Sequence, residues 1–573
     1  MKRATFRKFA DLCKDLESIS SNTSMRGKLE DYFSKLSKDD IRYASYMLLG
    51  NIRPKYKSND MGIGDKTAIS IAAKAFEKKE NKVKNLFDKK GDMGDVVEKL
   101  NSKKRSSLSL KDVHDRLVKI QNSSGKGSQE KKAEKLSGLL KDAASLESRY
   151  IMRIALGKLR LGVGDMTILE AFAAAFTGDT KNKDDIEDSY NVCTDIGALG
   201  ESLAKNGLKG AKRFSITLGR PVQAMLAQRV KKASQILEKI EGDVLAAEHK
   251  YDGERVQIHK DKDEVKLFSR KLEDITKQYP DLVEYIKEYV KAKKAVIDGE
   301  IVAYKKGKIL SFQKLMHRRR KYDVEEYRKK IPVIVFVFDL LYVNGNSMLK
   351  KPYPKRREKL EKIINQRSKK VRLADRKTSR KFEQIKDFFE KAVKDGLEGI
   401  IVKSTSKDSI YKPGKRGWLW IKWKKEYEEG MQESFDVVVV GSFHGKGRRK
   451  GMFGALLCAV YNKDKDRFET FTKVGAGFTD EDFKDIGKKL KKFKAKEKPK
   501  RLKVKKNMEP DIYYEPKMVI EIIGAEITRS PSHTAGTKKG KGLALRFPRF
   551  QSLRQDKSAE DATTVKEVRS LKK

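Results

Sequence analysis

A lysine lies between two carboxylates in the segment Glu248-His249-Lys250-Tyr251-Asp252-Gly253-Glu254-Arg255. The segment has the pattern of a β-strand that ends in a tight Asp-Gly turn and is followed by an alternating strand. Glu248 and Lys250 are two residues apart, so their side chains share one face of a strand. The pattern therefore places an amine beside a carboxylate at a turn that a ligand can approach. Such an amine is either a nucleophile or an exposed hairpin lysine.

Six further short segments combine apolar runs with charged or aromatic side chains. They are residues 268–270 (FSR), 297–302 (IDGEIV), 335–340 (VFVFDL), 398–403 (EGIIVK), 420–424 (WIKWK) and 545–550 (LRFPRF). The pattern K-x-D-G-x-R around Lys250 resembles the nucleophile motif of the covalent nucleotidyltransferases, the superfamily of DNA ligases, RNA ligases and mRNA capping enzymes. The six segments resemble the remaining motifs of that superfamily and occur in its order. This agreement favours the nucleophile over the exposed lysine.

The composition indicates a polyanionic partner. The 573 residues are enough for three or four domains of about 150 residues each. Lys and Arg number 131 against 81 Asp and Glu, which gives a formal net charge of +50. Such a balance favours contacts with phosphates, and a lysine-rich soluble surface is the alternative explanation.

The three cysteines, Cys13, Cys193 and Cys458, are far apart. Their spacing argues against a disulfide framework and a four-cysteine zinc site, so each is expected to be buried. The amino terminus lacks the apolar run of a signal peptide, and no stretch of about 20 apolar residues is present. We therefore predict a reduced, intracellular protein, cytoplasmic if its source is archaeal, with no membrane partner.

Residues 1 to about 215 are predicted to be mostly helical, with a polar surface loop near residues 121–132. This region contains an internal repeat, because residues 62–67 (GIGDKT) and 162–167 (GVGDMT) both place G-x-G-D-x-T before an apolar helix. Asp65 or Thr67 in the first copy, and Asp165 or Thr167 in the second, are the expected N-caps. Two equivalent turns of a pseudo-symmetric bundle explain the repeat as well as a binding role does.

The surroundings of the second copy favour a binding role. Gly162 and Gly164 leave backbone amides bare near a helix N-terminus, a geometry suited to phosphate. Lys158 and Arg160 lie beside this turn. The stretch from Leu159 to Asp165 also resembles the helical DNA-binding domain of archaeal and eukaryotic ATP-dependent DNA ligases. We therefore predict that these four residues contact DNA.

The resemblance covers nearly the whole chain and points to an ATP-dependent DNA ligase of the archaeal type. It implies a multidomain protein with an all-α DNA-binding domain (residues 1–216), an α+β nucleotidyltransferase domain (217–430) and a β-barrel domain of the OB type (431–573), with a hinge at 428–434. Its expected partner is nicked double-stranded DNA, with a sliding clamp as a further candidate although no docking peptide is evident. We predict a monomer.

The chemistry requires a neutral lysine amine, although the reference pKa of lysine is about 10.4. Nearby cations such as Arg255, Lys422 and Lys424 would disfavour the charged form. The neutral amine of Lys250 would then attack the α-phosphate of ATP, expel pyrophosphate and form a lysyl-adenylate. Lys422 and Lys424 are two apart on a strand, so both can face the phosphate and stabilise the charge that develops in the transition state.

The resemblance also implies how the rest of the nucleotide is bound. Glu398 would belong to a Mg²⁺ site, which Glu300 can share while it meets the ribose hydroxyls, and Mn²⁺ is the alternative metal. Phe338 would stack on adenine, and Glu248 would accept a hydrogen bond from the adenine amino group. A turn cap is the alternative role for each of the acids Glu300 and Glu398, and a core position is the alternative for Phe338.

Five arginines complete the predicted site. Arg255, Arg270 and Arg416 are candidate phosphate or ribose contacts. Arg546 and Arg549 flank Phe547-Pro548, in a segment that by resemblance swings over the active site and orients the leaving pyrophosphate. A basic edge on a nucleic-acid-binding barrel is the alternative for this last pair.

Three alternative functions fit the sequence less well than an ATP-dependent DNA ligase. An RNA ligase or capping enzyme shares K-x-D-G, but the upstream helical region and the glutamate at 248 argue against it. An NAD-dependent ligase would carry a cysteine zinc site and a different short domain before the lysine. A non-catalytic DNA-binding scaffold would not need the complete set of Lys250, Glu398, Lys422 and Lys424.

Overall fold

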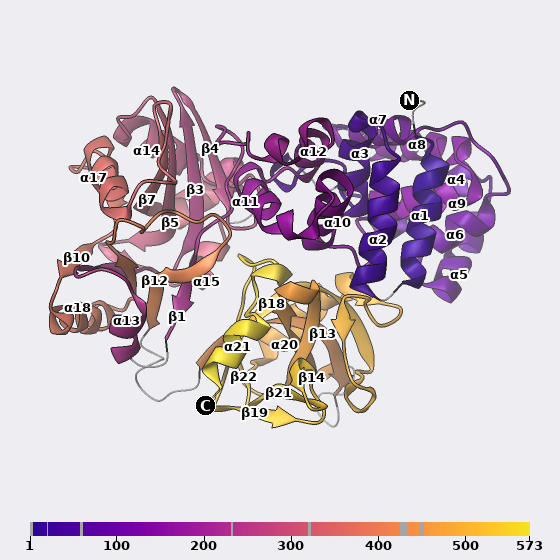
Figure 1. Cartoon of the computed structure of the whole chain (residues 1–573). Coiled ribbons are helices and arrows are strands. Elements are labelled where there is room, and N and C mark those ends of the chain that lie inside the picture. Colours follow the sequence, from indigo (N-terminus) through magenta and orange to yellow (C-terminus); the bar gives the residue numbers. More distant parts are fainter. Residues whose placement is uncertain are drawn as a thin grey trace.

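A computed structural model describes residues 4–19, 21–57, 61–230, 233–318, 323–424, 433–445 and 452–572. Figure 1 shows a helical N-terminal domain beside a central domain of two sheets, with a sheet-rich C-terminal domain below and between them. The predicted boundary after residue 430 and most of the predicted hinge at 428–434 lie outside the described residues. The boundary after residue 216 stays a prediction. Within the described residues, no helix has the length and apolarity needed to cross a membrane.

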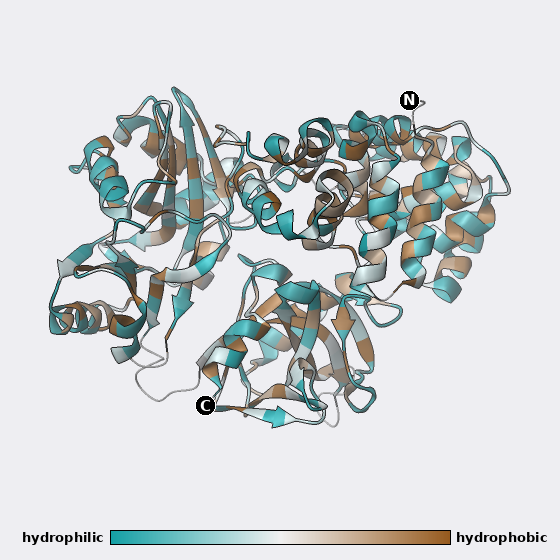
Figure 2. Cartoon of the chain, viewed as in Figure 1, coloured by the Kyte–Doolittle hydropathy of each residue, from teal (hydrophilic) through white to brown (hydrophobic). Residues whose placement is uncertain are grey.

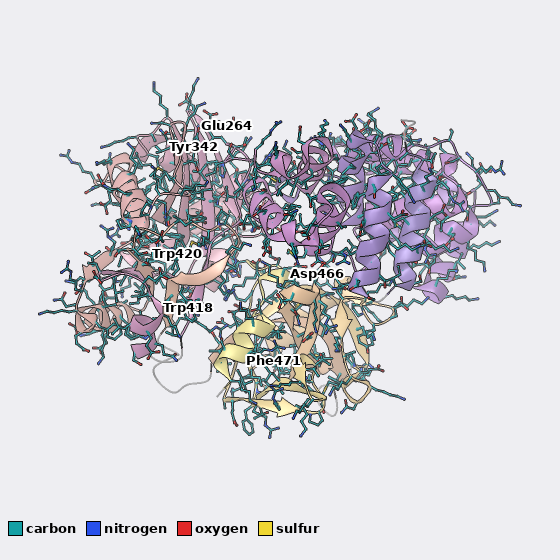
Figure 3. The ribbon with its side chains drawn as sticks, viewed as in Figure 1. Glu264, Tyr342, Trp418, Trp420, Asp466 and Phe471 are labelled. Carbon is teal, nitrogen blue, oxygen red and sulfur yellow. The ribbon has the colours of Figure 1, made fainter. Side chains whose placement is uncertain are left out.

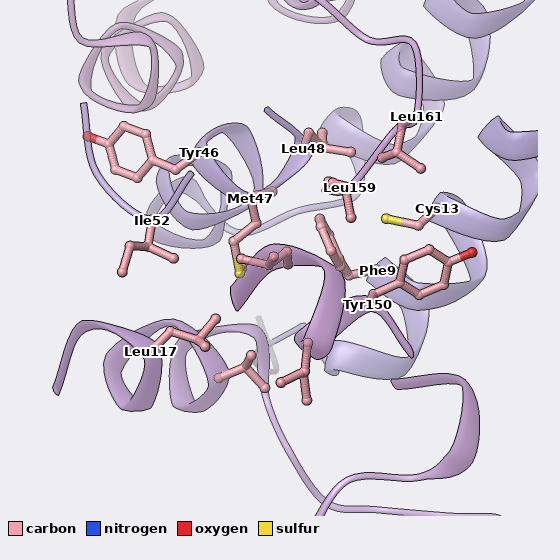
Figure 4. Close-up of a cluster of buried hydrophobic side chains, with 14 of the residues drawn as sticks. Phe9, Cys13, Tyr46, Met47, Leu48, Ile52, Leu117, Tyr150, Leu159 and Leu161 are labelled. Carbon is pink, nitrogen blue, oxygen red and sulfur yellow. The ribbon is translucent and has the colours of Figure 1, made fainter. Parts of the chain in front are cut away.

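The N-terminal domain is a helical bundle, as predicted. Its apolar residues gather on the faces that the helices turn toward one another (Figure 2), and Phe9, Met47 and Leu117 belong to its core (Figure 4). The helices are α1 (Phe6–Ser18), α2 (Asn22–Ser34), α3 (Lys38–Leu48), α4 (Asp65–Ala75), α5 (Glu80–Lys90), α6 (Met93–Leu100), α7 (Leu110–Gln121), α8 (Ser128–Asp142), α9 (Ser145–Ala155), α10 (Asp165–Thr177), α11 (Lys183–Cys193) and α12 (Ile196–Ala211).

Two local predictions for this domain are wrong. The polar stretch after Gln121 is not all loop, because α8 begins at Ser128, where Leu136, Leu139 and Leu140 supply a buried face. The N-caps of α4 and α10 are Gly64 and Gly164, whereas the predicted Asp residues are the first residues of their helices. An acid in the first turn is stabilised by the helix dipole without acting as the cap. All three cysteines are buried and free, as expected.

The central domain consists of two sheets. One has the strand order β1-β12-β11-β2-β10, and the other has the order β4-β3-β5-β7-β8, with β6 beside β5 and β9 beside β7. The strands are β1 (Leu226–Arg229), β2 (Leu245–Lys250), β3 (Glu254–Asp261), β4 (Glu264–Ser269), β5 (Lys294–Lys305), β6 (Lys308–Ile309), β7 (Val333–Val343), β8 (Asn346–Ser347), β9 (Val371–Leu373), β10 (Arg376–Ser379), β11 (Gly399–Ser404) and β12 (Arg416–Lys424).

Helices cover the outer faces of these sheets. Ile236 of α13 and Phe389 of α18 pack on the first sheet with Ile421 and Trp423, so alternate residues of β12 face this core. Leu282 of α14 contributes to the core of the second sheet. The helices are α13 (Ser234–Lys239), α14 (Pro280–Tyr289), α15 (Phe312–Met316), α16 (Val324–Lys330), α17 (Tyr353–Ile363) and α18 (Phe382–Lys394).

The C-terminal domain is built on a sheet with the order β16-β18-β13-β14-β15-β17, with β22 beside β18, and a second sheet with the order β19-β21-β20. Its elements are β13 (Glu433–His444), β14 (Phe453–Asn462), β15 (Arg467–Val474), α20 (Asp480–Leu490), β16 (Lys494–Ala495), β17 (Leu502–Lys503), β18 (Ile512–Gly524), β19 (Glu526–Ser530), β20 (Ala535–Lys538), β21 (Lys541–Arg546), β22 (Arg549–Leu553) and α21 (Val565–Leu571). The predicted sheet-rich domain and short final helix are therefore present.

Polar side chains join the three domains. The contacts include Lys415 with Asp188 (3.0 Å) between the central and helical domains, Arg229 with the Ser434 carbonyl (2.9 Å) between the central and C-terminal domains, and Thr167 with Asp466 (2.6 Å) between the helical and C-terminal domains. Residues of all three domains line one hollow of about 1790 Å³.

Candidate active site

Lys250 ends β2, where the chain passes from one central sheet to the other. β2 pairs with β11 in the first sheet, and β3 pairs with β4 and β5 in the second. The connecting turn contains Gly253, where a Cβ atom would overlap the Ile301 carbonyl of β5. Glycine therefore allows the turn to approach β5 this closely. Tyr251 fixes the turn by stacking on Phe336, with 3.8 Å between ring centroids.

One carboxylate holds lysines from two strands. The Lys250 Nζ lies 2.7 Å from the Glu398 Oε2, and the Lys424 Nζ lies 3.0 Å from the same atom. The register explains this, because Gly399 of β11 pairs with Lys250 on one side and with Lys424 on the other. Burial raises the pKa of Glu398, but the two ammonium groups outweigh it and hold that pKa well below its usual range. Glu398 is therefore ionised.

A second carboxyl group faces the same cleft. Glu300 of β5 pairs in register with Arg255 of β3. Burial raises the pKa of Glu300 to about 8 against the attraction of Lys250 and Arg255, and the Glu398 carboxylate adds to the rise. Burial also raises the pKa of Asp252. These crowded oxygen atoms repel one another, so a bound divalent cation would stabilise them.

The cleft, with a volume of about 490 Å³, has an aromatic wall. Phe338 of β7 lies edge to face with Trp420 of β12, with 6.2 Å between ring centroids. Arg255 and Lys403 lie over the Phe338 ring, at 5.4 and 5.1 Å from its centroid. This wall offers the flat apolar surface that the sequence predicts for a base. The strand itself is longer than predicted, because β7 continues to Val343.

Glu248 and Arg255 are already bonded within the central domain. Glu248 is 2% exposed and is bonded to Tyr353, Arg357 and Lys403. Arg255 donates to the Asp298 carboxylate at 2.8 Å and to the Met225 carbonyl at 2.7 Å. Both residues line the cleft. They are therefore held in place at its wall.

Three arginines that line the cleft are bonded to the C-terminal domain. Arg416 of β12 forms an ion pair with Glu567 of α21, and Arg229 of β1 lies 3.6 Å from the same carboxylate. Arg270 lies 3.4 Å from Asp561. Carboxylates thus occupy a surface whose charge suits phosphates.

Lys422 lies beside this basic group. Its side chain has no hydrogen bond or ion pair with any residue that the structure describes, although it lines the cleft, and its backbone is held in the pairing of β12 with β11. Burial, together with repulsion from Arg229 and Arg416, lowers its pKa well below the usual lysine value. An anion that reached this position would be strongly attracted.

Arg546 and Arg549 do not line the cleft. They lie at the end of β21 and the start of β22, where both are exposed. Phe547 between them is 70% exposed and has a φ of 50°, in the left-handed region that costs energy for a bulky residue. Contact of these arginines with a nucleotide would need another placement of the C-terminal domain, and it stays a prediction.

The two repeat turns of the helical domain face the larger hollow, which Arg270 and Arg416 also line. Their acids are paired crosswise, because Lys158 lies 2.8 Å from Asp65 and Lys55 lies 3.3 Å from Asp165. Each turn is therefore neutralised by a lysine from the other copy. This arrangement agrees with the pseudo-symmetric bundle inferred from the repeat.

The second turn is covered by the C-terminal domain. The Thr167 hydroxyl donates to Asp466 at 2.6 Å, and a Cβ atom at Gly164 would overlap that carboxylate. Figure 3 shows Asp466 on the side of the C-terminal domain that faces the helical domain. Arg160 is engaged as well, at 3.3 Å from Glu515. By contrast, apart from the glycine itself and its neighbours in the chain, no atom of the described residues lies within 4 Å of a Cβ built at Gly64 in the first turn.

Four cationic residues that line the cleft were not predicted from the sequence, namely Arg229, Lys403, Arg554 and Lys557. Lys403 lies within the segment 398–403. It is two residues from Ile401 on the same strand, so the two side chains share the face that lines the cleft, and this spacing could have indicated its role. Arg229 precedes the nucleophile by 21 positions and matches no motif. Only the pairing of β1 with β12 brings it next to Lys422.

Three family models match the chain. They are described as the DNA ligase N terminus (residues 5–173), the ATP dependent DNA ligase domain (224–424) and the ATP dependent DNA ligase C terminal region (449–557). The chain is similar to DNA ligase 1 of Methanosarcina acetivorans (51% identical, 99% of each chain), DNA ligase 1 of Methanosarcina barkeri (52%, covering 94% of this chain and 99% of the other) and DNA ligase 2 of Thermofilum pendens (44%, covering 98% and 96%).

Proposed function

This chain belongs to the ATP-dependent DNA ligases, and from that premise we propose that it seals nicks in duplex DNA through an adenylate on Lys250. In the first step the Lys250 Nζ loses its proton to solvent, the neutral amine forms a bond to the α-phosphorus of ATP, and pyrophosphate leaves. In the second the 5′-phosphate at the nick attacks that phosphorus and breaks the P–N bond. In the third the 3′-hydroxyl attacks the activated 5′-phosphate, which closes the backbone and releases AMP.

The observation that carries the proposal is the convergence of Lys250, Glu398, Lys422 and Lys424 in one cleft. Glu398 aims both Lys250 and Lys424 at the same region, so the attacking amine and a phosphate-stabilising cation would meet the same group. Phe338 would bind the base, and Glu300 would accept hydrogen bonds from the ribose. Arg255, Arg270 and Arg416 would contact the ribose or the phosphates.

Glu398 and Glu300 are the proposed ligands of Mg²⁺ or Mn²⁺. Among the described residues, no group of three or more His, Cys, Asp or Glu side chains forms a closed metal cage. This suits Mg²⁺, which takes few protein carboxylates and completes its shell with water and phosphate oxygens. When bound, the ion would neutralise charge on the phosphates of ATP. The raised pKa of Glu300 fits a carboxyl group that such a cation would stabilise.

The DNA would lie in the hollow shared by the three domains. Lys158, Arg160, Gly162 and Gly164 line it and would contact the backbone, since a sealing enzyme must ignore sequence. We further propose domain limits of 1–216, 217–430 and 431–573, an OB-type barrel in the third domain and a monomeric enzyme. Arg546 and Arg549 would reach the nucleotide when the third domain moves.

Sealing is tested on a duplex that carries a single nick with a 5′-phosphate, in ATP and Mg²⁺. The matched substrate has a 5′-hydroxyl at the same nick, which cannot accept the adenylate. We expect joining of the first substrate and none of the second. Equal yields from both, or from neither, would contradict the proposal.

Self-adenylation is expected to depend on the ionisation of Glu300. A carboxyl group with a pKa raised to about 8 is neutral below that pH and charged above it, and its proposed roles need the charged form. The value of kcat/KM for ATP should therefore rise with pH through about pH 8. Glu300→Gln should remove this rise and lower the plateau about tenfold or more. If the rise persists unchanged in the glutamine variant, another group causes it.

Asp466→Asn is expected to strengthen the binding of nicked DNA about fivefold at moderate salt. Asp466 occupies the turn at Gly164, so it competes with a DNA phosphate for that position. Asparagine keeps the size of the side chain but removes the charge that Arg501 and Thr167 hold. The measurement is a salt titration of DNA affinity by fluorescence anisotropy.

Asp464→Asn provides the matched control for this effect. Asp464 is exposed in the same connection between β14 and β15, so its loss changes the net charge equally without freeing the turn. A similar gain in DNA affinity in both variants would show that the effect comes from the loss of one negative charge and not from release of the turn at Gly164. Weaker binding by the Asp466 variant would contradict the competition.

A further inference from the structure

Helix α17 presents two donors to Glu248. Tyr353 is the first residue of the helix and Arg357 lies four positions later, so their side chains share one face one turn apart. The Tyr353 hydroxyl lies 2.5 Å from the Glu248 Oε1, and the Arg357 Nη1 lies 2.9 Å from the same atom. Neither residue belongs to a segment that the sequence singled out.

Both donors are anchored elsewhere. The backbone N–H of Tyr353 donates to the Ser409 carbonyl at 2.9 Å, which fixes the start of the helix. Arg357 uses its other nitrogens on Glu361 at 2.8 Å and on the Ala374 carbonyl at 2.9 Å. Its guanidinium is therefore held from three directions and cannot follow Glu248 if that side chain moves.

The remaining acceptor capacity of Glu248 is small. An ionised carboxylate offers about four lone-pair positions. Tyr353 and Arg357 take two on the Oε1, and the Lys403 Nζ takes one on the Oε2 at 2.6 Å. Among the described residues no other side chain bonds to Glu248, so one position on the Oε2 is left, in a side chain that lines the cleft. The arrangement suits a single N–H donor from a ligand and disfavours a carbonyl oxygen, which would meet a lone pair.

We propose that Tyr353 and Arg357 are positioning residues that fix the rotamer of Glu248 and thereby set the preference for a 6-aminopurine nucleotide. The inference rests on the proposed contact of Glu248 with the adenine amino group. Neither residue touches the nucleotide in this account. Their effect reaches the base only through the direction of the last free lone pair on Glu248.

The burial of the group explains why positioning matters. Glu248 is 2% exposed, and Tyr353 and Arg357 are 1% and 4% exposed. No bulk water can replace a lost donor at this depth, so the carboxylate would turn toward Lys403 and Arg357 instead. A turned carboxylate no longer meets the amino group at hydrogen-bond geometry.

The test compares self-adenylation by ATP and by purine riboside 5′-triphosphate, which carries hydrogen in place of the 6-amino group. Tyr353→Phe removes the hydroxyl and keeps the ring that packs beside Lys403. We expect the wild-type protein to prefer ATP. In the variant, the ratio of kcat/KM for ATP to kcat/KM for purine riboside triphosphate should fall about tenfold. The fall should come chiefly from a higher KM for ATP, while the values for purine riboside triphosphate change little. Arg357→Gln should shift the ratio in the same direction.

Arg376→Gln is the matched control. Arg376 lies opposite Glu248 in the pairing of β10 with β2 and holds Glu361 at 3.1 Å, the same acid that Arg357 holds, but among the described residues no hydrogen bond or ion pair joins its side chain to Glu248. Its loss should leave the nucleotide ratio unchanged. Thermal unfolding of each variant, followed by circular dichroism, checks that the fold is retained.

The results distinguish a failure of the positioning role of Tyr353 and Arg357 from a failure of the proposed contact between Glu248 and the adenine amino group. Equal losses with both nucleotides in Tyr353→Phe, at an unchanged ratio, would overturn the positioning role while Glu248 still reads the base. A wild-type protein without preference between the two nucleotides would show that Glu248 does not read the amino group, and both proposals would fall. Neither result would contradict the proposed role of Lys250 as the nucleophile.

Discussion

Lys250→Ala is expected to lose nick sealing completely, by a factor of at least about 10⁴, because no other amine can carry the adenylate. Lys422 and Lys424 line the same cleft, but both lie on β12, and their proposed role is to stabilise the charge on the phosphate rather than to attack it. The same variant should still seal a nick whose 5′ end was adenylated beforehand, since the third step does not use the Lys250 amine. The measurement is joining of both substrates by gel electrophoresis.

Lys277→Ala is the control for loss of a lysine. Lys277 is exposed and lies outside the cleft, so its removal should change neither reaction. Residual sealing of the ordinary nick by Lys250→Ala, above the level of a reaction without ATP, would show that another residue carries the adenylate. Loss of activity on both substrates would point to a damaged fold instead.

Glu398→Gln is expected to lower self-adenylation about 10³-fold. The substitution removes the charge that orients Lys250 and Lys424, and it leaves two ammonium groups facing each other without their counter-ion. It also removes a proposed metal ligand, so the metal concentration at half-maximal rate should rise. The measurement is the rate of enzyme-adenylate formation over a series of Mg²⁺ concentrations.

Glu521→Gln isolates the role of Glu398. Glu521 belongs to the C-terminal domain and lies 3.9 Å from the Lys424 Nζ. Its replacement by glutamine removes one negative charge, as Glu398→Gln does, but at the edge of the group formed by Lys250, Glu398 and Lys424. It should reduce the rate only slightly. A rate for Glu398→Gln equal to that of the wild type would remove Glu398 from both its orienting and its metal-binding roles.

The contribution of Glu398 to the free energy of unfolding is expected to depend on pH. Its pKa in the folded protein lies well below the ordinary value, so it contributes stability that is present above the unfolded pKa of about 4.3. That contribution is lost as the pH falls through the lower folded value. The glutamine variant is therefore less stable than the wild type at neutral pH, and the difference disappears in strong acid.

Much of the site follows from local patterns in the sequence. The order of the short segments, and the two-residue spacings of Glu248 with Lys250 and of Lys422 with Lys424, place side chains on strand faces that the structure brings to one cleft. The three-domain arrangement is implied by the resemblance to the ATP-dependent DNA ligases, and the helical pattern of residues 1 to about 215 agrees with it. The pattern predicts these features because strand periodicity is a local property of the chain.

The features that the sequence did not reveal depend on long-range contacts. Arg229 joins the cleft through the parallel pairing of β1 with β12, and Arg357 reaches Glu248 across 109 positions. The docking of Asp466 on Gly164 joins two domains whose complementarity no local pattern encodes. The N-caps were misplaced because glycine and aspartate are both good candidates at such turns, and the choice depends on the path of the preceding backbone.

We expect this chain to carry an adenylate on Lys250 and to pass it to DNA. The most direct measurement incubates the purified protein with α-labelled ATP and Mg²⁺ and separates it by denaturing electrophoresis, with GTP, NAD and the Lys250→Ala variant alongside. We predict a labelled protein band from ATP alone, which is absent in the variant and is removed by nicked duplex DNA. A band from GTP would assign a capping-type activity, and no band from any nucleotide would contradict the account.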